Sequence, residues 1–101
     1  MPDAAKAALD ILDQQVKELD AILKQAKLDL NTVAGGERVA KWKARAIPVL
    51  SQHLGEKHGQ RLAQITPGLT FTNDFMEEFS EEVEEYRNCL MAMVKELKKA
   101  E

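Results

Sequence analysis

Cysteine is nearly absent from this chain of 101 residues, which has a single one, Cys89. One cysteine cannot form a disulfide within the chain, so a disulfide-stapled secreted scaffold is excluded and a cytoplasmic location is expected. Long apolar runs are lacking as well, because charged residues recur every few positions through residues 1–30. We therefore expect no signal peptide, no membrane helix and no membrane partner.

Aromatic residues make up only 5% of the sequence, and three prolines and five glycines interrupt it. With 45% hydrophobic and 31% charged residues, the composition is typical of a helical protein and excludes a disordered tail or a collagen-like chain. The length predicts a single domain, residues 1–101, whose core is large enough to fold without a metal or a disulfide.

An excess of positive charge is also missing, since the formal net charge is −3. A protein dedicated to long DNA needs a large cationic surface, so that class is excluded. The charges are unevenly placed, however: residues 35–65 hold six bases and two acids, whereas residues 66–101 hold four bases and nine acids. A basic surface is therefore expected only on the middle segment.

Apolar residues recur at steps of three and four and predict an all-α domain of four helices. A long first helix is expected over residues 3–30 and a long last helix over residues 74–99, packed antiparallel. Two short helices, residues 37–54 and 57–65, are expected between them. The periodic apolar positions of the long helices are Ala5, Leu9, Leu12, Val16, Leu19, Leu23, Ala26 and Leu30, then Phe75, Phe79, Val83, Tyr86, Leu90, Met93 and Leu97.

Helix breakers and capping residues predict where these helices end. Gly35-Gly36 is expected to form the turn after the first helix, and Pro48 to kink or break the second. Gly55 is expected to end the second helix, and Pro67-Gly68 to stop the third. Asn73-Asp74 supplies the side chains expected to cap the last helix.

Residues that carry chemistry are present without the partners that catalysis or metal binding needs. His53 and His58 have no cysteine or carboxylate at ligand spacing. The acidic run of the last helix lacks the Glu-x-x-His pattern of carboxylate metal sites. Cys89 has no recognisable histidine partner and is expected to be a packed thiol. We expect no enzyme activity, no metal, no cofactor and no small-molecule substrate.

The basic residues of the second and third helices are candidates for contacts with phosphates. Trp42 lies among them and would stack on a base if they bind a nucleic acid. Trp42 is also in phase with Val39 and Ala46, so core packing is the favoured interpretation of its indole. A small nucleic-acid-binding helical protein that uses residues 37–65 is therefore the alternative function. The six candidates are Arg38, Lys41, Lys43, Arg45, Lys57 and Arg61.

The apolar stripe of the first helix runs farther than the expected short helices and one long partner easily cover. Two interpretations stay open: the long helices pack together within one chain, or the core continues into a second subunit as a homodimer. The favoured function is accordingly a non-enzymatic protein–protein interaction or adaptor module. The candidate partner-binding residues are Leu12, Leu19, Leu23, Trp42, Arg45 and Tyr86.

Residues 36–65 form a recognisable order of features: Trp42-x-x-Arg45, an aliphatic stretch that ends in Leu54-Gly55-Glu56, and a short helix with an apolar last residue. This order resembles a small helical segment that recurs in prokaryotic antiviral and conflict-system proteins. The resemblance implies an accessory or adaptor role in antiviral defence or counter-defence. It carries over no catalytic residue.

Overall fold

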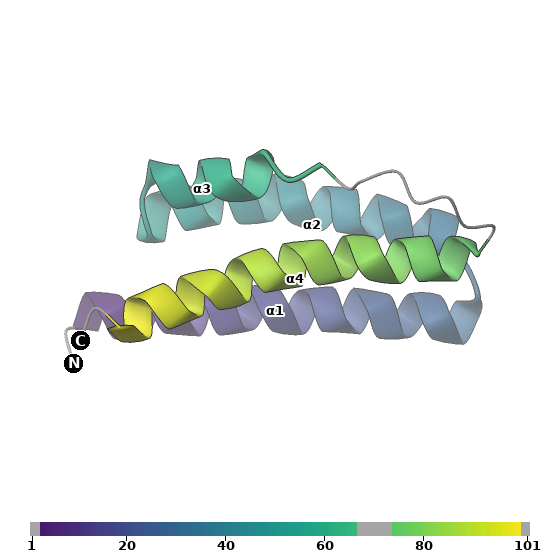
Figure 1. Ribbon diagram of the computed structural model, residues 1–101, viewed down its shortest axis with the longest axis horizontal. Coiled ribbons are helices and arrows are strands. Elements are labelled where there is room, and N and C mark those ends of the chain that lie inside the picture. The colour runs from purple at the N-terminus through teal and green to yellow at the C-terminus, as the bar shows by residue number, and fades with distance from the viewer. Residues whose placement is uncertain (1–2, 67–73, 100–101) are drawn as a thin grey trace.

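Four helices form the computed structural model, which describes residues 3–66 and 74–99. They are α1 (Asp3–Asp29), α2 (Thr32–His53), α3 (Glu56–Ala63) and α4 (Phe75–Lys99), and no strand occurs among the described residues. The predicted all-α class and four-helix architecture, with a long first and a long last helix, are confirmed (Figure 1).

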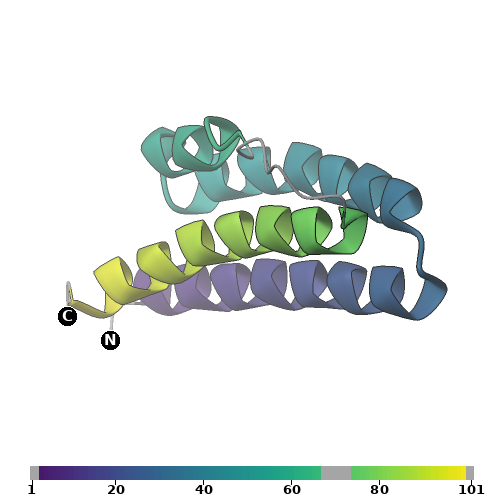
Figure 2. The ribbon, with the colours of Figure 1, turned by 45° about the vertical axis from the view of Figure 1, so that its right-hand side comes forward.

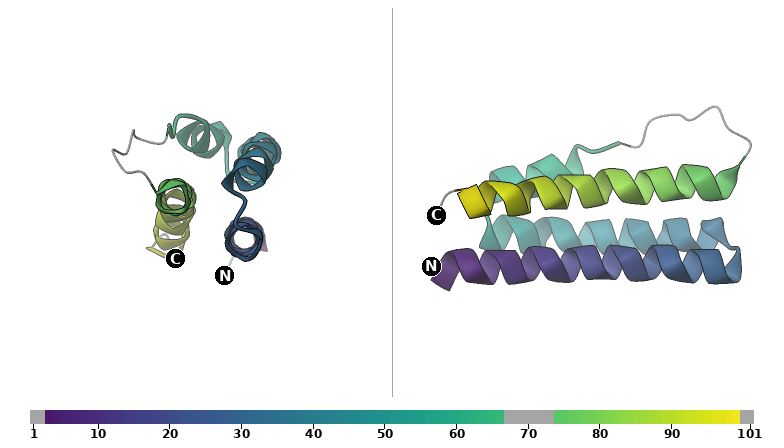
Figure 3. Two further views of the ribbon diagram at one scale, coloured as in Figure 1. Left: turned by 90° about the vertical axis from the view of Figure 1, so that its right-hand side faces the viewer. Right: turned by 60° about the horizontal axis from the view of Figure 1, so that its bottom comes forward.

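The helices lie along the long axis of a molecule that extends 46 × 24 × 21 Å. α1 and α4 run antiparallel, so the start of α1 and the end of α4 share one end of the bundle (Figures 1 and 2). α1 contacts α2 and α4, and α3 contacts α2 and α4 (Figure 3). α3 therefore lies across the bundle from α1, and the outer face that α1 shares with α4 is covered by neither α2 nor α3.

One apolar cluster joins the four helices. Each helix contributes the residues that its periodicity places on one side, and the largest enclosed side chain is that of Trp42, near the middle of α2. Burial of this apolar surface is the main stabilising contribution to such a fold. The cluster contains Leu12, Val16, Leu19, Ala26, Val39, Trp42, Ala46, Leu50, Leu62, Phe79, Val83, Tyr86, Leu90 and Met93.

The predicted apolar stripe of α1 is buried unevenly. Leu12 and Leu19 are fully enclosed, whereas Leu9 and Leu23 are half-buried at the edge facing α4. Leu30, at the end of the stripe, is exposed. The reason is that α1 contacts only α2 and α4. Residues on the side of α1 that faces between these two helices are enclosed, whereas residues at the two edges of the stripe stay partly exposed.

The predicted turn at Gly35-Gly36 is wrong, because α2 begins at Thr32 and contains both glycines. Gly35 is buried where α2 approaches α1 and α4: a Cβ built on it would lie 2.7 Å from Phe79 Cζ and 3.0 Å from Ala26 Cβ. Close packing of three helices therefore explains a glycine that local propensity assigns to a turn. As a consequence, α2 has 22 residues and is longer than the predicted second helix.

The other breakers behave differently from one another. α2 continues through Pro48 to His53, so the helix does not break there. Gly55 does end the helix as predicted: its φ of +114° is a conformation that other residues rarely adopt, and its N–H donates to the Leu50 carbonyl at 3.2 Å. Pro67-Gly68, the predicted stop of the third helix, lies outside the described residues.

Candidate functional site

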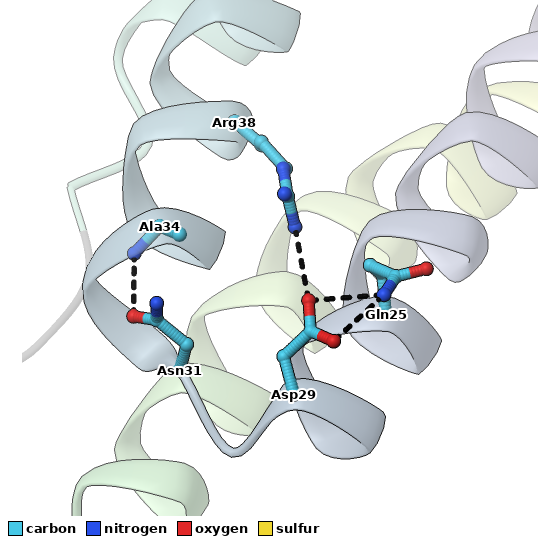
Figure 4. Close-up of polar contacts among 5 residues, drawn as sticks. All are labelled: Gln25, Asp29, Asn31, Ala34 and Arg38. Carbon is cyan, nitrogen blue, oxygen red and sulfur yellow. Dashed lines mark hydrogen bonds and ion pairs between the residues drawn. The ribbon is translucent and has the colours of Figure 1, made fainter.

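The corner between α1 and α2 is built by the backbone and one capping side chain. Leu30 follows α1 with a left-handed φ of 53°, and the Asn31 N–H donates to the Ala26 carbonyl at 3.2 Å, which is the pattern of a Schellman motif. Asn31 Oδ1 then accepts a hydrogen bond from the Ala34 N–H at 3.0 Å and caps α2 (Figure 4). The chain reverses within two residues, and α2 is set beside α1.

Polar contacts hold this corner on its outer side. Gln25 Nε2 donates to both carboxylate oxygens of Asp29 at 2.9 Å, and Arg38 Nη1 lies 3.9 Å from Asp29 Oδ2 (Figure 4). The Asp29–Arg38 pair links the last turn of α1 to the second turn of α2, but both side chains are more than 40% exposed. Solvent therefore weakens the attraction between the two charges. The pair helps to orient α2 against α1 but contributes little to the free energy of unfolding.

Leu30 is expected to be the weakest backbone position of this corner. A left-handed conformation costs a residue with a Cβ about 1 kcal/mol, and the Leu30 side chain is 83% exposed. We expect Leu30→Gly to raise the free energy of unfolding by about 1 kcal/mol, measured by urea denaturation. The matched control is Leu30→Ala, which removes the apolar side chain but keeps the Cβ; an equal gain in this control would contradict the backbone explanation.

Large apolar side chains are exposed at the end of the bundle where this corner lies. The C-terminal end of α1, the start of α2 and the start of α4 meet there (Figures 1 and 3). Among the described residues, every large apolar side chain classed as exposed belongs to one of these three helix ends or to the corner itself. We call this set the apolar end: Leu28, 70% exposed, Leu30, 83%, Val33, 74%, and Phe75, 71%.

The start of α4 fixes one member of the apolar end. Asp74 Oδ1 accepts hydrogen bonds from the N–H groups of Met76 at 3.0 Å and Glu77 at 3.2 Å, so the predicted cap at Asp74 is confirmed. Asn73, the other predicted capping residue, lies outside the described residues. The cap places Phe75 in the first turn of α4, where its ring is exposed while Phe79, one turn later, is buried.

Acidic residues accompany two members of the apolar end. Glu37 lies one turn beyond Val33 on α2 and Glu78 lies one turn beyond Phe75 on α4, so each carboxylate shares a helix face with an exposed apolar side chain. Glu37 is exposed and Glu78 is half-buried. Val33 and Phe75 are therefore flanked by negative charge, whereas Lys24 and Lys27 lie beside Leu28.

Most of the partner-binding residues predicted from sequence lie in the core. Leu12, Leu19 and Trp42 are 0% exposed and Tyr86 is 3% exposed. An enclosed side chain does not touch a partner while the domain stays folded. The prediction that these four residues contact a partner is therefore wrong, and they pack in the core instead. Leu23, which is half-buried, and Arg45, which is exposed, remain at the surface.

The six basic candidates do not form one surface. Arg38 is paired with Asp29, and Arg61 Nη1 lies 2.8 Å from Glu96 Oε2 on α4. Lys43 turns inward, as described below. The remaining three, Lys41, Arg45 and Lys57, are exposed, and the Arg45 Nε donates to the Lys41 carbonyl at 3.5 Å along α2.

Lys43 ties together three elements instead of facing solvent. Its Nζ donates to the Ile65 carbonyl, beyond the end of α3, at 2.8 Å and to the Tyr86 hydroxyl on α4 at 3.3 Å, and it lies 4.9 Å from the centre of the Tyr86 ring. Burial raises the pKa of the nearby Glu82 carboxyl, while the Lys43 charge opposes that rise. Lys43 is thus a structural cation that holds the end of α3 against α4.

The residues considered for catalysis or metal binding stay apart in the structure. Among the described residues, no group of three or more His, Cys, Asp or Glu side chains is placed to hold a metal ion. Cys89 is half-buried, and burial raises the pKa of its thiol; the Arg61 charge opposes this rise and Glu96 adds to it. The thiol form is therefore favoured over the reactive thiolate.

No family model, no curated protein and no solved structure matches the chain. The resemblance of residues 36–65 to a segment of antiviral proteins stays a prediction. Within the described part of the chain, no helix has the length and apolar character needed to cross a membrane.

Sequence reasoning missed the apolar end as a surface. Leu30 and Phe75 are the terminal members of the two long apolar stripes. Periodicity predicts burial for a terminal member just as it does for an internal one. Val33 lay in the segment assigned to the turn. The position of a residue in its helix could have revealed this surface. An apolar residue in the first or last turn has a neighbouring turn on one side only, so it is covered less than an internal one.

Proposed function

We propose that this protein is a non-enzymatic interaction module that binds a protein partner through the apolar end. The observation that carries the proposal is the gathering of Leu28, Leu30, Val33 and Phe75, each at least 70% exposed, at one end of a small helical bundle. Exposed large apolar side chains that cluster in this way are typical of binding surfaces, and aromatic side chains such as Phe75 often anchor them.

The flanking charges define the partner chemistry. Glu37 and Glu78 accompany Val33 and Phe75, whereas Lys24 and Lys27 accompany Leu28. The rim therefore favours a partner with basic residues opposite Val33 and Phe75 and acidic residues opposite Leu28. The resemblance of residues 36–65 supports a further proposal, that the module is an accessory or adaptor in a prokaryotic antiviral defence or counter-defence system.

Substitution at the apolar end is expected to abolish partner binding without unfolding the protein. The test variant combines Val33→Gln and Phe75→Gln, two exposed positions whose replacement removes apolar contact area. We expect the purified partner, identified by quantitative affinity capture, to bind this variant at least about 30-fold more weakly, since a buried aromatic anchor contributes about 2 kcal/mol. Calorimetry with the wild-type chain and the variant measures this ratio.

The matched control combines Ala7→Gln and Gln14→Asn, exposed α1 positions outside the apolar end, and keeps wild-type affinity. Equal affinity of the apolar-end variant and the wild-type chain, with both folded by circular dichroism, would remove the proposal.

A nucleic-acid-binding role is the second candidate, and one observation favours it. Arg38, Lys41 and Arg45 are exposed and follow one another at helical spacing, so they form a row along one side of α2. Anisotropy with a labelled generic oligonucleotide at low salt, repeated with Lys41→Glu and Arg45→Glu, separates this role from the first. Salt-dependent binding that these charge reversals abolish would favour it.

A further inference from the structure

The outer face that α1 shares with α4 has an open hollow at each end. The hollow near the start of α1 has a volume of about 320 Å³ and is lined by Leu9, Val16, Met91 and Val94 together with charged residues. The hollow near the end of α1 has a volume of about 410 Å³ and includes Leu23 and Val83. This face therefore combines partly exposed apolar edges with space, and Leu28 is the residue that it shares with the apolar end.

Charged residues of both signs surround the two hollows. At the first hollow α1 contributes Asp10 and Asp13 and α4 contributes Lys98. At the second, α1 contributes Asp20 and Lys27 and α4 contributes Glu84 and Arg87, so both signs occur on each helix. Along the exposed stripe of α1, however, Asp10 and Asp13 lie toward its start and Lys24 and Lys27 toward its end. A surface with this arrangement is complementary to a reversed copy of itself.

The register along α1 makes this complementarity specific. Three pairs of exposed charges, each of opposite sign, lie at equal distances on either side of a point between Glu18 and Leu19. Leu9 and Leu28 are spaced about the same point; Leu9 lines the first hollow, and Leu28 lies on α1 beside Lys24 and Lys27. The three pairs are Asp10 with Lys27, Asp13 with Lys24, and Lys17 with Asp20.

We propose that a second copy of this chain binds this face, with its α1 antiparallel to the first α1 and a two-fold axis passing beside the point between Glu18 and Leu19. In this arrangement Asp13 of each copy faces Lys24 of the other, and Leu28 of each copy reaches the hollow beside Leu9. The ion pair of Asp20 with Arg87, 3.2 Å long, joins α1 to α4 on the same face.

The size of the face suits a dimer whose strength depends on salt. A molecule 46 Å long and 24 Å across has room for the about 800 Å² per partner that stable complexes bury. Because the centre of the face is charged and its apolar residues lie at the two ends, screening by salt is expected to weaken the contact. An unrelated partner would not need the reversal symmetry of the α1 charges, whereas a second copy requires it.

Sedimentation velocity on the full chain tests the proposal. We expect dimer at about 50 mM salt that dissociates on dilution and at about 500 mM salt. Asp10→Lys with Asp13→Lys makes the α1 face basic, and Lys24→Glu with Lys27→Glu makes it acidic, so each variant alone is expected to be monomeric. An equimolar mixture of the two is expected to form a heterodimer, which also shows that both variants are folded.

Zero-length carbodiimide cross-linking gives a measurement that needs no variant. Asp13 and Lys24 are eleven positions apart on one helix, about 16 Å, which exceeds the reach of a direct amide link within a chain. In a mixture of ¹⁵N-labelled and unlabelled protein, we expect an Asp13–Lys24 link that joins the two isotopic forms. A wild-type chain that stays monomeric at every concentration, a dimer that survives both charge variants, or a mixture of variants that stays monomeric would each overturn the proposal.

These outcomes are separable from those of the partner-binding test. Val33 and Phe75 are not part of the α1–α4 face, so the apolar-end variant is expected to dimerise like the wild-type chain. Loss of partner binding and loss of dimer therefore arise from different substitutions.

Discussion

Trp42→Ala is expected to lower the free energy of unfolding by about 3 to 5 kcal/mol, the largest loss from any single substitution considered for this chain. The indole is 0% exposed, and its ring lies 5.8 Å from the Tyr86 ring at a tilt of 58°. Truncation leaves a cavity between α2 and α4 that the surrounding helices cannot fill. Because small domains have a total stability of about 5 to 15 kcal/mol, urea denaturation followed by far-ultraviolet circular dichroism resolves the change readily.

Trp42→Phe is the matched control and is expected to cost less than half as much. Phenylalanine keeps an aromatic ring against Tyr86. It also removes the Trp42 Nε1–H, which is buried and has no hydrogen-bond partner among the described residues, and an unsatisfied buried donor is itself unfavourable. If Trp42→Ala instead stayed as stable as the wild-type chain and lost only partner binding, the assignment of Trp42 to the core would be wrong.

Gly59→Ala is expected to lower the free energy of unfolding by about 2 kcal/mol, although alanine is the better helix former. Gly59 is buried where α3 packs on α2, and a Cβ built on it would lie 2.9 Å from the Ile47 carbonyl oxygen and against the Ser51 side chain. The Ile47 oxygen belongs to the backbone of α2 and cannot rotate away. α3, which has only 8 residues, must therefore shift outward and lose the enclosed packing of Leu62.

Two further variants isolate the steric cause of the Gly59 effect. Gly36→Ala lies within α2 with nothing within 4 Å of its Cβ, so it is expected to stabilise the protein by about 1 kcal/mol through helix propensity alone. Ser51→Ala removes the hydroxyl that the Gly59 Cβ would meet, and the Gly59→Ala and Ser51→Ala pair is expected to show a coupling of at least about 0.5 kcal/mol in a double-mutant cycle. Independent, additive effects would indicate that α3 does not pack at this distance.

The elements that the sequence predicted well are those in which a local pattern and the tertiary contacts agree. The apolar positions of α4 from Phe79 to Met93 are buried as their spacing predicts, because one continuous side of that helix contacts its neighbours. Asp74 caps α4 and Gly55 ends α2, since both effects arise from a few adjacent backbone groups.

The failures occur where a distant helix changes the meaning of a residue. The local propensity of Gly35 predicts a turn. The residue instead lies inside α2, where Phe79 approaches so closely that the position requires a residue without a Cβ. Lys43 is predicted from sequence to be one of six surface cations. Its Nζ instead donates hydrogen bonds to the Ile65 carbonyl and the Tyr86 hydroxyl, 22 and 43 positions away, and therefore points inward. Neither the approach of Phe79 to Gly35 nor the hydrogen bonds of Lys43 can be recognised from the residues adjacent in sequence.

The amino-acid sequence by itself determined that the chain forms four helices, which side of each helix is apolar and where most of the helices end, because these features depend on residues within one or two turns of each other. The tertiary structure alone decided which members of the apolar stripes stay exposed and which cations remain at the surface. Exposure depends on how many helices pack around a position. Leu12 lies within the bundle and is enclosed, whereas Leu30 and Phe75 lie at the helix ends and are left facing solvent.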